Sequence, residues 1–259
     1  MTHILCQRHG AILEIRIQRP EKLNALSVAM YHDIGRALAE LERDDALRVA
    51  VVCAEGKHFT AGVELDQWAP YFRSGEGFPL AAGEIDLFGL AGPRRCKPVV
   101  MAVQGYCFTW GVEMLLATEV RVAAEDTQFA MLEVQRGLYP CGGATLRLPQ
   151  QMGWANAQRY LLTGDRWSAE EAHRTGLVQE VVAPGTQREA AMRLAEGIAR
   201  AAPLAVQGVL KATRFAQHHP EAEAIDQMFR DLVPVMESED AAEGLQSFVE
   251  RREAVFKGR

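Results

Sequence analysis

Two glutamates in this chain have mostly apolar neighbours. Glu113 is the only charged residue between Val99 and Ala117, and it falls in the first turn of an expected helix, while Glu133 lies in the apolar stretch 129–134. A buried carboxylate is unfavourable unless it is paired, hydrogen-bonded or neutralised. Burial raises the pKa of such a group toward the range useful for proton transfer, whereas a helix N-terminus favours the anion. The two side chains are therefore candidates for general acid–base chemistry.

Each glutamate also has a purely structural explanation. Glu113 could accept hydrogen bonds from backbone amides or pair with a buried arginine, and Glu133 could pair with Arg136 or Arg147. Residue types alone leave both explanations open.

Other familiar chemistry is missing from the sequence. There is no G-x-S-x-G, H-E-x-x-H or Walker-type motif, and no G-x-G-x-x-G follows an expected strand. The seven histidines lack the convergent spacing of metal ligands, so no metal site is predicted. The Gly142-Gly143 pair indicates a backbone constrained by close approach or by positive φ, at a simple turn or at the start of a helix containing Leu146 and Leu148.

Composition narrows the class of protein. A chain of 259 residues with a formal net charge of -6 has no basic surface for nucleic acid or an anionic membrane. The five cysteines form no CxxC pair, which predicts a reducing, cytoplasmic setting, and the N-terminal residues do not resemble a signal sequence. The apolar run 99–117 contains Gln104, Thr109 and Glu113, so a buried strand and helix explain it better than a membrane span.

The elements that must position the glutamates alternate between strands and helices, which predicts an α/β fold. Residues 4–8 and 11–17 predict a hairpin, and residues 56–92, which are rich in glycine, predict a loose segment bordering a site. Further strands are expected at 49–53, 99–103, 119–123 and 178–182, and helices at 28–41 after Ser27, 111–117, and between Ser168 and Gly176.

The C-terminal part is expected to be helical. Pro203 suits the first turn of a helix, and Ser238 precedes a helix with an acidic start and a basic end at Arg251 and Arg252. We therefore expect a core over residues 1–200 and a helical region over 201–259. About sixty helical residues cannot easily form an independent core, so this region should pack on the main domain or on a neighbouring subunit.

Several segments, in order along nearly the whole chain, resemble the crotonase (enoyl-CoA hydratase/isomerase) superfamily. They are Arg19–Leu26, Lys57–Leu65, Lys97–Val99 leading to Gln104–Tyr106, Leu162–Gly164, Glu171–Ala172, Gly176–Val178 and Phe248–Arg252. The resemblance implies a spiral of ββα units whose C-terminal helices make trimer contacts, commonly in a dimer of trimers.

The resemblance also implies a site for a coenzyme A thioester, with CoA as part of the substrate and no separate cofactor. The thioester carbonyl would accept hydrogen bonds from the backbone amides of Val63 and Trp110, which would stabilise an enolate. The residues implied for binding CoA are Lys22, Ala25, Ala61 and Lys257.

Members that hydrate a 2-enoyl-CoA to a 3-hydroxyacyl-CoA, by syn addition of water, carry glutamates at the positions of Glu113 and Glu133. By that likeness, Glu113 would polarise the attacking water and Glu133 would exchange the proton at the α-carbon. Double-bond isomerisation is the first alternative, and a non-catalytic acyl-CoA-binding relative is the second.

Two departures from the family pattern bear on these alternatives. Many relatives have three glycines where this chain has Thr109-Trp110-Gly111, so the indole should reshape the acyl cavity, and in the non-catalytic alternative it would block it. Cys141 replaces a glycine, or in some branches a catalytic acid, and is expected to be a small core thiol rather than a nucleophile.

Overall fold

The computed structural model describes residues 3–259, and six of its strands form one central sheet in the order β1-β2-β3-β4-β6-β9. The first two strands are antiparallel, and every later pair in this sheet is parallel. The strands of this sheet are β1 (Ile4–His9), β2 (Ile12–Ile17), β3 (Val49–Ala54), β4 (Val99–Val103), β6 (Val120–Ala124) and β9 (Glu180–Val182). The predicted hairpin and α/β class are confirmed.

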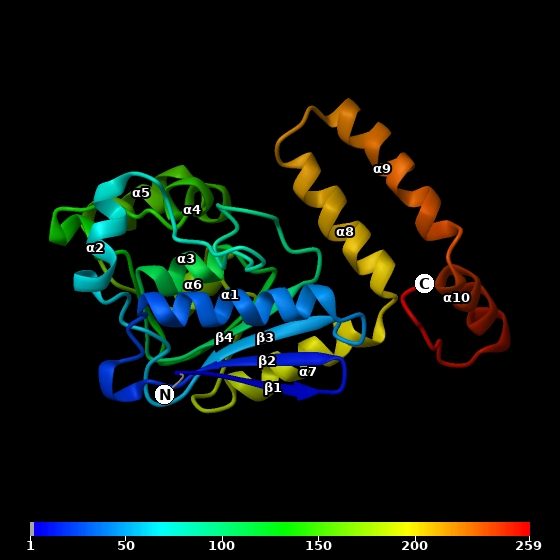
Figure 1. Cartoon of the computed structure of the whole chain (residues 1–259), viewed down its shortest axis with the longest axis horizontal. Coiled ribbons are helices and arrows are strands. Elements are labelled where there is room, and N and C mark those ends of the chain that lie inside the picture. The colour runs from blue at the N-terminus through cyan, green and yellow to red at the C-terminus, as the bar shows by residue number, and fades with distance from the viewer. Residues whose placement is uncertain (1–2) are drawn as a thin grey trace.

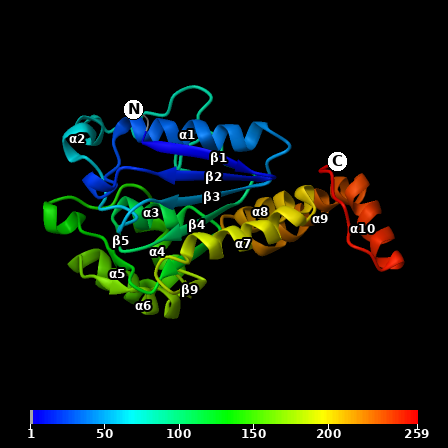
Figure 2. The ribbon, with the colours of Figure 1, turned by 90° about the horizontal axis from the view of Figure 1, so that it is seen from below.

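Helices cover both faces of this sheet. On β3, Val49, Val51 and Cys53 belong to the cluster that packs against α7 (Gln187–Arg200), whereas Ala50 and Val52 belong to the main core on the opposite face. The helices α1 (Val28–Arg43) and α3 (Trp110–Leu116) lie on that opposite face (Figures 1 and 2). Successive strand residues point to opposite faces, so a strand buried on both faces is apolar throughout.

The structure also has a second, smaller sheet. It has the order β5-β7-β8, from β5 (Tyr106–Phe108), β7 (Gln128–Ala130) and β8 (Trp167–Ser168). The remaining short elements around it are α4 (Ala144–Met152), α5 (Trp154–Thr163), α6 (Ala169–Arg174) and the 3-10 turns η1 (Pro20–Lys22) and η2 (Glu133–Arg136). The α3 and α4 helices contact each other, which brings two distant parts of the sequence together.

The expected helix starts are present, with one difference. The Ser27 hydroxyl accepts a hydrogen bond from Met30 N at 3.2 Å, and the Ser168 hydroxyl accepts one from Glu171 N at 3.2 Å. Ser168 and Glu171 have the spacing of a capping box, in which the glutamate would also accept from the Ser168 amide, but the Glu171 carboxylate pairs instead with Arg174. An exposed arginine one turn along the helix offers a charged partner in place of the backbone amide.

The expectation of a loose segment over residues 56–92 was wrong in part. Residues Leu65–Ser74 form the helix α2, which ends at Gly75 with φ 70°. Trp68 anchors this helix, because its side chain is fully buried and its indole N–H donates to Leu26 O at 3.0 Å. The many later glycines obscured a short helix whose apolar residues hold it to the core.

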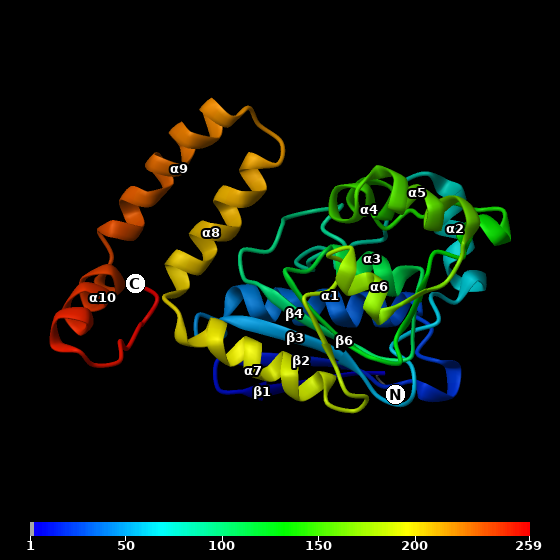
Figure 3. The same ribbon diagram turned by 180° about the vertical axis from the view of Figure 1, so that it is seen from behind.

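The last three helices stand away from the sheet, as Figures 1 and 3 show. They are α8 (Pro203–Ala216), α9 (Glu221–Met236) and α10 (Glu239–Glu250). Pro203 begins α8, and the Ser238 hydroxyl caps α10 as expected. The predicted basic end of α10 was wrong, because Arg251 adopts φ 54° and ends the helix before the arginines.

The division at residue 200 falls between α7 and α8, and it stays a prediction. Within residues 3–259, no helix combines the length and apolar character needed to cross a membrane.

Candidate active site

The turn between β5 and α3 sets the position of the first glutamate. Thr109 lies in this turn with φ 50° and ψ -109°, a conformation that is unfavourable for a β-branched residue. Its amide donates to Ala130 O at 2.8 Å, which ties the turn to β7. Backbone strain of this kind persists only where surrounding contacts impose it, and it concentrates at functional sites.

Glu113 is completely buried beneath the start of α4. Its Oε1 atom accepts a hydrogen bond from Ala144 N at 3.0 Å, whereas Oε2 has no hydrogen-bond partner within residues 3–259. Gly142 lies against the carboxylate, since a Cβ atom on it would stand 2.6 Å from Oε2. Loss of solvent is the largest effect and raises the pKa of Glu113 to about 8, against the amide hydrogen bond from Ala144.

Glu133 begins the turn η2 and is partly buried. Its Oε2 atom is enclosed and has no partner in the described part of the chain, and desolvation raises its pKa to about 7. Neither glutamate forms an ion pair there, so the alternative that Glu133 pairs with Arg136 or Arg147 was wrong. The Arg136 guanidinium instead donates to Gln135 O at 3.3 Å.

The structural explanation of Glu113 is correct for one oxygen only. Its Oε1 accepts an amide hydrogen bond. Its Oε2 is enclosed and has no partner among residues 3–259, so hydrogen bonding within the fold does not explain this second oxygen. The carboxyl groups are also close enough for the charge on Glu133 to raise the pKa of Glu113 further. Paired carboxyl groups whose pKa values approach neutrality are suited to proton transfer at physiological pH.

A mostly apolar cavity of about 590 Å³ lies beside Glu133. The surface of this cavity comes from α2 and the loop after it, the β5–α3 turn, η2 and the segment following η2. The lining residues are Ala61, Val63, Leu65, Tyr71, Phe72, Gly75, Gly77, Phe78, Thr109, Trp110, Leu132, Glu133, Arg136, Gly137, Leu138, Tyr139 and Cys141. Glu113 lies behind this lining, next to Gly142 and therefore adjacent to Cys141 in the wall.

The two residues whose amides are expected to form an oxyanion hole line the same cavity. Val63 and Trp110 both line it, although they lie in different loops. Across residues 3–259 neither N–H group donates a hydrogen bond. The β-bridge between Leu26 and Val63 uses the amides of Leu26 and Glu64, which leaves that of Val63 free. The Trp110 amide is free because Trp110 is the first residue of α3. Two unpaired donors on one cavity wall can bind a developing oxyanion.

The Trp110 indole is mostly part of the core. It is 3% exposed and packs against Trp68 and Phe88, with ring centroids 4.4 and 4.7 Å away. Phe78 completes this aromatic cluster at 5.4 Å. The indole thus shapes one wall of the cavity while leaving the space open, in contrast to the blocked pocket of the non-catalytic alternative.

Cys141 is not a core thiol, contrary to the expectation. The residue is exposed and lines the cavity, because the turn before Gly142 faces outward. Desolvation of the sulfur, together with the charges of Glu113 and Glu133, raises the pKa of its thiol to about 11. A thiol that stays protonated at neutral pH is a poor nucleophile, in agreement with the rest of that prediction.

Three of the four residues expected to bind CoA lie together. Ala61 N donates to Leu23 O and Ala25 N donates to Lys22 O, both at 3.0 Å, so these loops adjoin beside the cavity. Lys257 lies instead in the C-terminal tail, where its amide donates to Asp240 of α10 at 2.6 Å. The tail and η1 are at opposite ends of the molecule in every view, so within one chain Lys257 is remote from the other three (Figures 1 and 2).

The acyl-side walls of the cavity were missed by sequence reasoning. Leu65, Tyr71, Phe72 and Phe78 all line the cavity, and the first three belong to α2. The helical spacing of Leu65, Trp68 and Phe72 was a usable signal for that element. In the part of the chain that is described, no three His, Cys, Asp or Glu side chains gather to hold a metal ion.

Known proteins similar to this chain share one family. The enoyl-CoA hydratase/isomerase family model matches residues 7–259. A carnitinyl-CoA dehydratase of Salmonella typhimurium (strain LT2) is 37% identical over 261 residues, covering 97% of each chain.

Solved structures agree with this match. A probable enoyl-CoA hydratase/isomerase from Mycobacterium abscessus has a TM-score of 0.96 at 41% identity, covering 100% of this chain and 99% of that one. An enoyl-CoA hydratase from Mycobacterium tuberculosis H37Rv has a TM-score of 0.91 at 35% identity, covering 99% of each. This chain belongs to the enoyl-CoA hydratase/isomerase family, and its fold is that of the crotonase superfamily.

Proposed function

We propose that this protein catalyses syn-hydration of a 2-enoyl-CoA to a 3-hydroxyacyl-CoA, and the reverse dehydration. The observation that carries the proposal is the pair of enclosed carboxyl groups, each with an unpartnered oxygen, beside a cavity with two free amides. The family is that of hydro-lyase-like enzymes acting on CoA thioesters, which agrees with this chemistry.

In the proposed reaction, the amides of Val63 and Trp110 bind the thioester oxygen as it gains negative charge. Ionised Glu113 accepts a proton from water while the water oxygen bonds to the β-carbon. Protonated Glu133 donates its proton to the α-carbon, which completes the 3-hydroxyacyl product. Transfer of the accepted proton from Glu113 to Glu133 restores the starting state, so protons balance over the cycle. No cofactor beyond the CoA of the substrate takes part.

The pKa values of the pair supply one carboxylate and one carboxylic acid. In the free protein the proton resides mainly on Glu113, whose pKa is the higher, so it must pass to Glu133 before water adds. With values of about 8 for Glu113 and about 7 for Glu133, the coupled pair holds a single proton between those pH values. One carboxylate and one carboxylic acid are the two species that hydration needs. Isomerisation needs only one carboxylate that moves a proton between two carbons, and would leave the second enclosed carboxyl group without a task.

The cavity lining favours an apolar acyl group of medium length or an aromatic one. Tyr71, Phe72 and Phe78 form one side, and the cavity of about 590 Å³ exceeds the need of a four-carbon chain. A carnitinyl group, named for several relatives, carries a quaternary ammonium ion that aromatic rings can bind. Arg136 is a fixed positive charge on the same lining and opposes that ligand.

CoA binding by Lys22, Ala25, Ala61 and Lys257 forms part of this proposal, with Lys257 supplied by a second copy. The apolar side chains of α8–α10 support such an assembly, since they include Phe229 at 61% and Phe248 at 82% exposure. Apolar surface of this extent is typical of an interface. We accordingly propose a homotrimer or a dimer of trimers in the cytoplasm, and place the enzyme in fatty acid metabolism.

The proposal is tested with a series of 2-enoyl-CoA thioesters of increasing chain length, together with an aryl analogue. Hydration is followed as loss of the conjugated-thioester absorbance, and products are identified by mass spectrometry. We expect turnover that improves from four carbons toward medium chains. Carnitinyl-CoA and 3-enoyl-CoA are assayed in parallel. Preference for carnitinyl-CoA would indicate the dehydratase activity named for the relatives, and turnover of 3-enoyl-CoA alone would indicate an isomerase.

Three matched variants locate the chemistry. Glu113→Gln and Glu133→Gln should each lower kcat by a factor on the order of 100 or more while CoA-thioester binding changes little. Glu196→Gln, at an exposed position on α7, should leave kcat unchanged. Thioester binding without hydration by the wild-type protein at any chain length would refute the hydratase proposal and favour a binding protein.

A further inference from the structure

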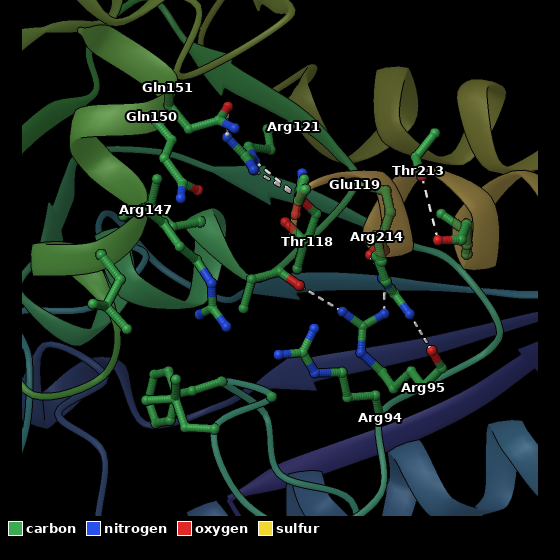
Figure 4. Close-up of a pocket in the computed structure, with 18 of the residues that line it drawn as sticks. Arg94, Arg95, Thr118, Glu119, Arg121, Arg147, Gln150, Gln151, Thr213 and Arg214 are labelled. Atoms are coloured by element: carbon green, nitrogen blue, oxygen red, sulfur yellow. Dashed lines mark hydrogen bonds and ion pairs between the residues drawn. The ribbon is translucent and has the colours of Figure 1, made fainter. Parts of the chain in front are cut away.

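A second cavity, of about 340 Å³, lies behind the start of α4 and outside the proposed active site (Figure 4). Its walls come from the loop before β4, the end of α3, α4 and α8. Five arginines line it against two carboxylates, Asp86 and Glu119, which leaves three positive charges in excess when histidine is neutral. An excess of like charge around a cavity is unfavourable unless something neutralises it.

Three of the five guanidinium groups are hydrogen-bonded or ion-paired within the protein. Arg95 and Arg214 both pair with Glu119, and Arg95 also donates to Ala117 O at 2.6 Å. Arg121 donates to Thr118 O and to Leu177 O at 2.9 and 3.1 Å. These three groups stabilise the cavity wall and have few free N–H donors for a ligand.

The other two guanidinium groups, of Arg94 and Arg147, have no partner. Neither side chain donates a hydrogen bond to, or pairs with, any residue from 3 to 259, and Arg147 Nη1 is enclosed. Figure 4 shows Arg147 projecting from α4 and Arg94 from the loop before β4, with both groups directed into the space between them. Each lies within the electrostatic reach of the other, because Arg94 lowers the pKa of Arg147 after burial, which is the larger cause.

Asp86 forms no hydrogen bond or ion pair with either free guanidinium group, although its charge partly offsets the burial that lowers the pKa of Arg147. Its carboxylate accepts hydrogen bonds from the Tyr31 hydroxyl at 2.9 Å and from the amides of Leu90 and Ala91 at 2.7 and 3.0 Å. Those contacts fix it in the loop wall. The space between the two free guanidinium groups is therefore cationic, enclosed on one side, and furnished with planar donors that match oxyanions in geometry.

We propose that this cavity binds a small oxyanion, a phosphate or a carboxylate, between Arg94 and Arg147. Gln150, on the next turn of α4, lines the same cavity and has a carboxamide that can donate hydrogen bonds (Figure 4). The site differs from the acyl cavity in every lining residue.

The position of Arg147 connects this site to the buried glutamate. Ala144 N, which donates to Glu113, lies one helical turn before Arg147, and a Cβ atom on Gly143 would stand 2.7 Å from Arg147 Nη1. The guanidinium group thus folds back over the start of α4. A bound anion would screen the positive charge that favours the Glu113 carboxylate, so occupancy would raise the pKa of Glu113.

The test is isothermal titration of the full-length protein with inorganic phosphate, and separately with succinate, at constant ionic strength in chloride. We expect saturable binding of at least one of these anions, and the stronger of the two identifies the ligand class. Arg94→Gln and Arg147→Gln should each weaken it about tenfold or more, because each variant loses a charge-assisted hydrogen bond to the anion. Arg94 is exposed and unpaired, so its replacement is compatible with folding.

Two controls make the result decisive. Arg200→Gln, at an exposed position outside the cavity, should bind as the wild type does, and Lys22→Gln reports on phosphate held at the CoA-binding residues. No saturable binding, or binding lost with Lys22→Gln and kept with Arg94→Gln, would overturn the proposal. A third result would also overturn it: no anion binding by the wild type, together with a change in the assembly mass of the Arg94 and Arg147 variants in sedimentation. That result would mean that an acidic side chain of a second copy fills the cavity.

Discussion

Replacing Glu113 by glutamine should increase the free energy of unfolding relative to the wild type by an amount that grows as the pH rises. The carboxyl group is enclosed, and its pKa is raised from 4.5 to about 8. Between those values the folded state keeps a proton that the unfolded state releases, so the stability of the wild type falls with increasing pH. Glutamine cannot ionise and removes this dependence. The unpaired amide of the variant adds a penalty, but that penalty does not vary with pH.

The size of the effect follows from the pKa shift. One pKa unit corresponds to about 1.4 kcal/mol, so ionisation of Glu113 in the unfolded chain lowers the free energy of unfolding of the wild type by about 1 kcal/mol at pH 5 and about 3 kcal/mol at pH 7. The free energy of unfolding of Glu113→Gln, minus that of the wild type, should therefore rise by about 2–3 kcal/mol between these pH values. Comparing two proteins at each pH cancels the titration of the groups that do not interact with Glu113.

The measurement is urea unfolding at pH 5, 6 and 7, with linear extrapolation and one fixed protein concentration, because assembly contributes to stability. Glu196→Gln on the exposed face of α7 serves as the control and should show no trend with pH. A difference between Glu113→Gln and wild type that stays constant from pH 5 to pH 7 would refute the reasoning, because it would mean that Glu113 ionises in the folded protein as readily as in the unfolded chain.

Three further predictions concern the same site. Gly142→Ala would put a Cβ atom 2.6 Å from Glu113 Oε2, so the displaced carboxylate should lower kcat about 100-fold with little change in KM, and an active variant would contradict the placement. The wild-type kcat/KM should be bell-shaped in pH with limbs near about 7 and 8, and Glu133→Gln should lose one limb; a flat profile would separate these groups from the reaction. Thr109→Gly should raise the free energy of unfolding by about 1 kcal/mol, measured in urea, because glycine tolerates φ 50°, and a loss of stability would show that the turn is unstrained.

The main elements of the fold were predictable where local pattern and burial agree. The strand 99–103 is apolar throughout because both faces of β4 are covered, and Ser27 has the side chain that a helix start requires. The α2 helix was missed because glycines follow it closely and its burial depends chiefly on Trp68. The course of α10 was misjudged at its end because a left-handed residue stopped it at Arg251.

Residue types and their order along the chain were enough to identify the two glutamates, the glycine pair beside them and the family to which the chain belongs. It could not determine their environment, because a pKa depends on what surrounds a carboxyl group in space. Only the tertiary structure placed Gly142 against Glu113 and left one oxygen of each carboxyl group unpartnered. The unpaired state of Arg147 was likewise decided by folding, because Glu119 pairs with Arg95 and Arg214 and Asp86 accepts hydrogen bonds from backbone amides.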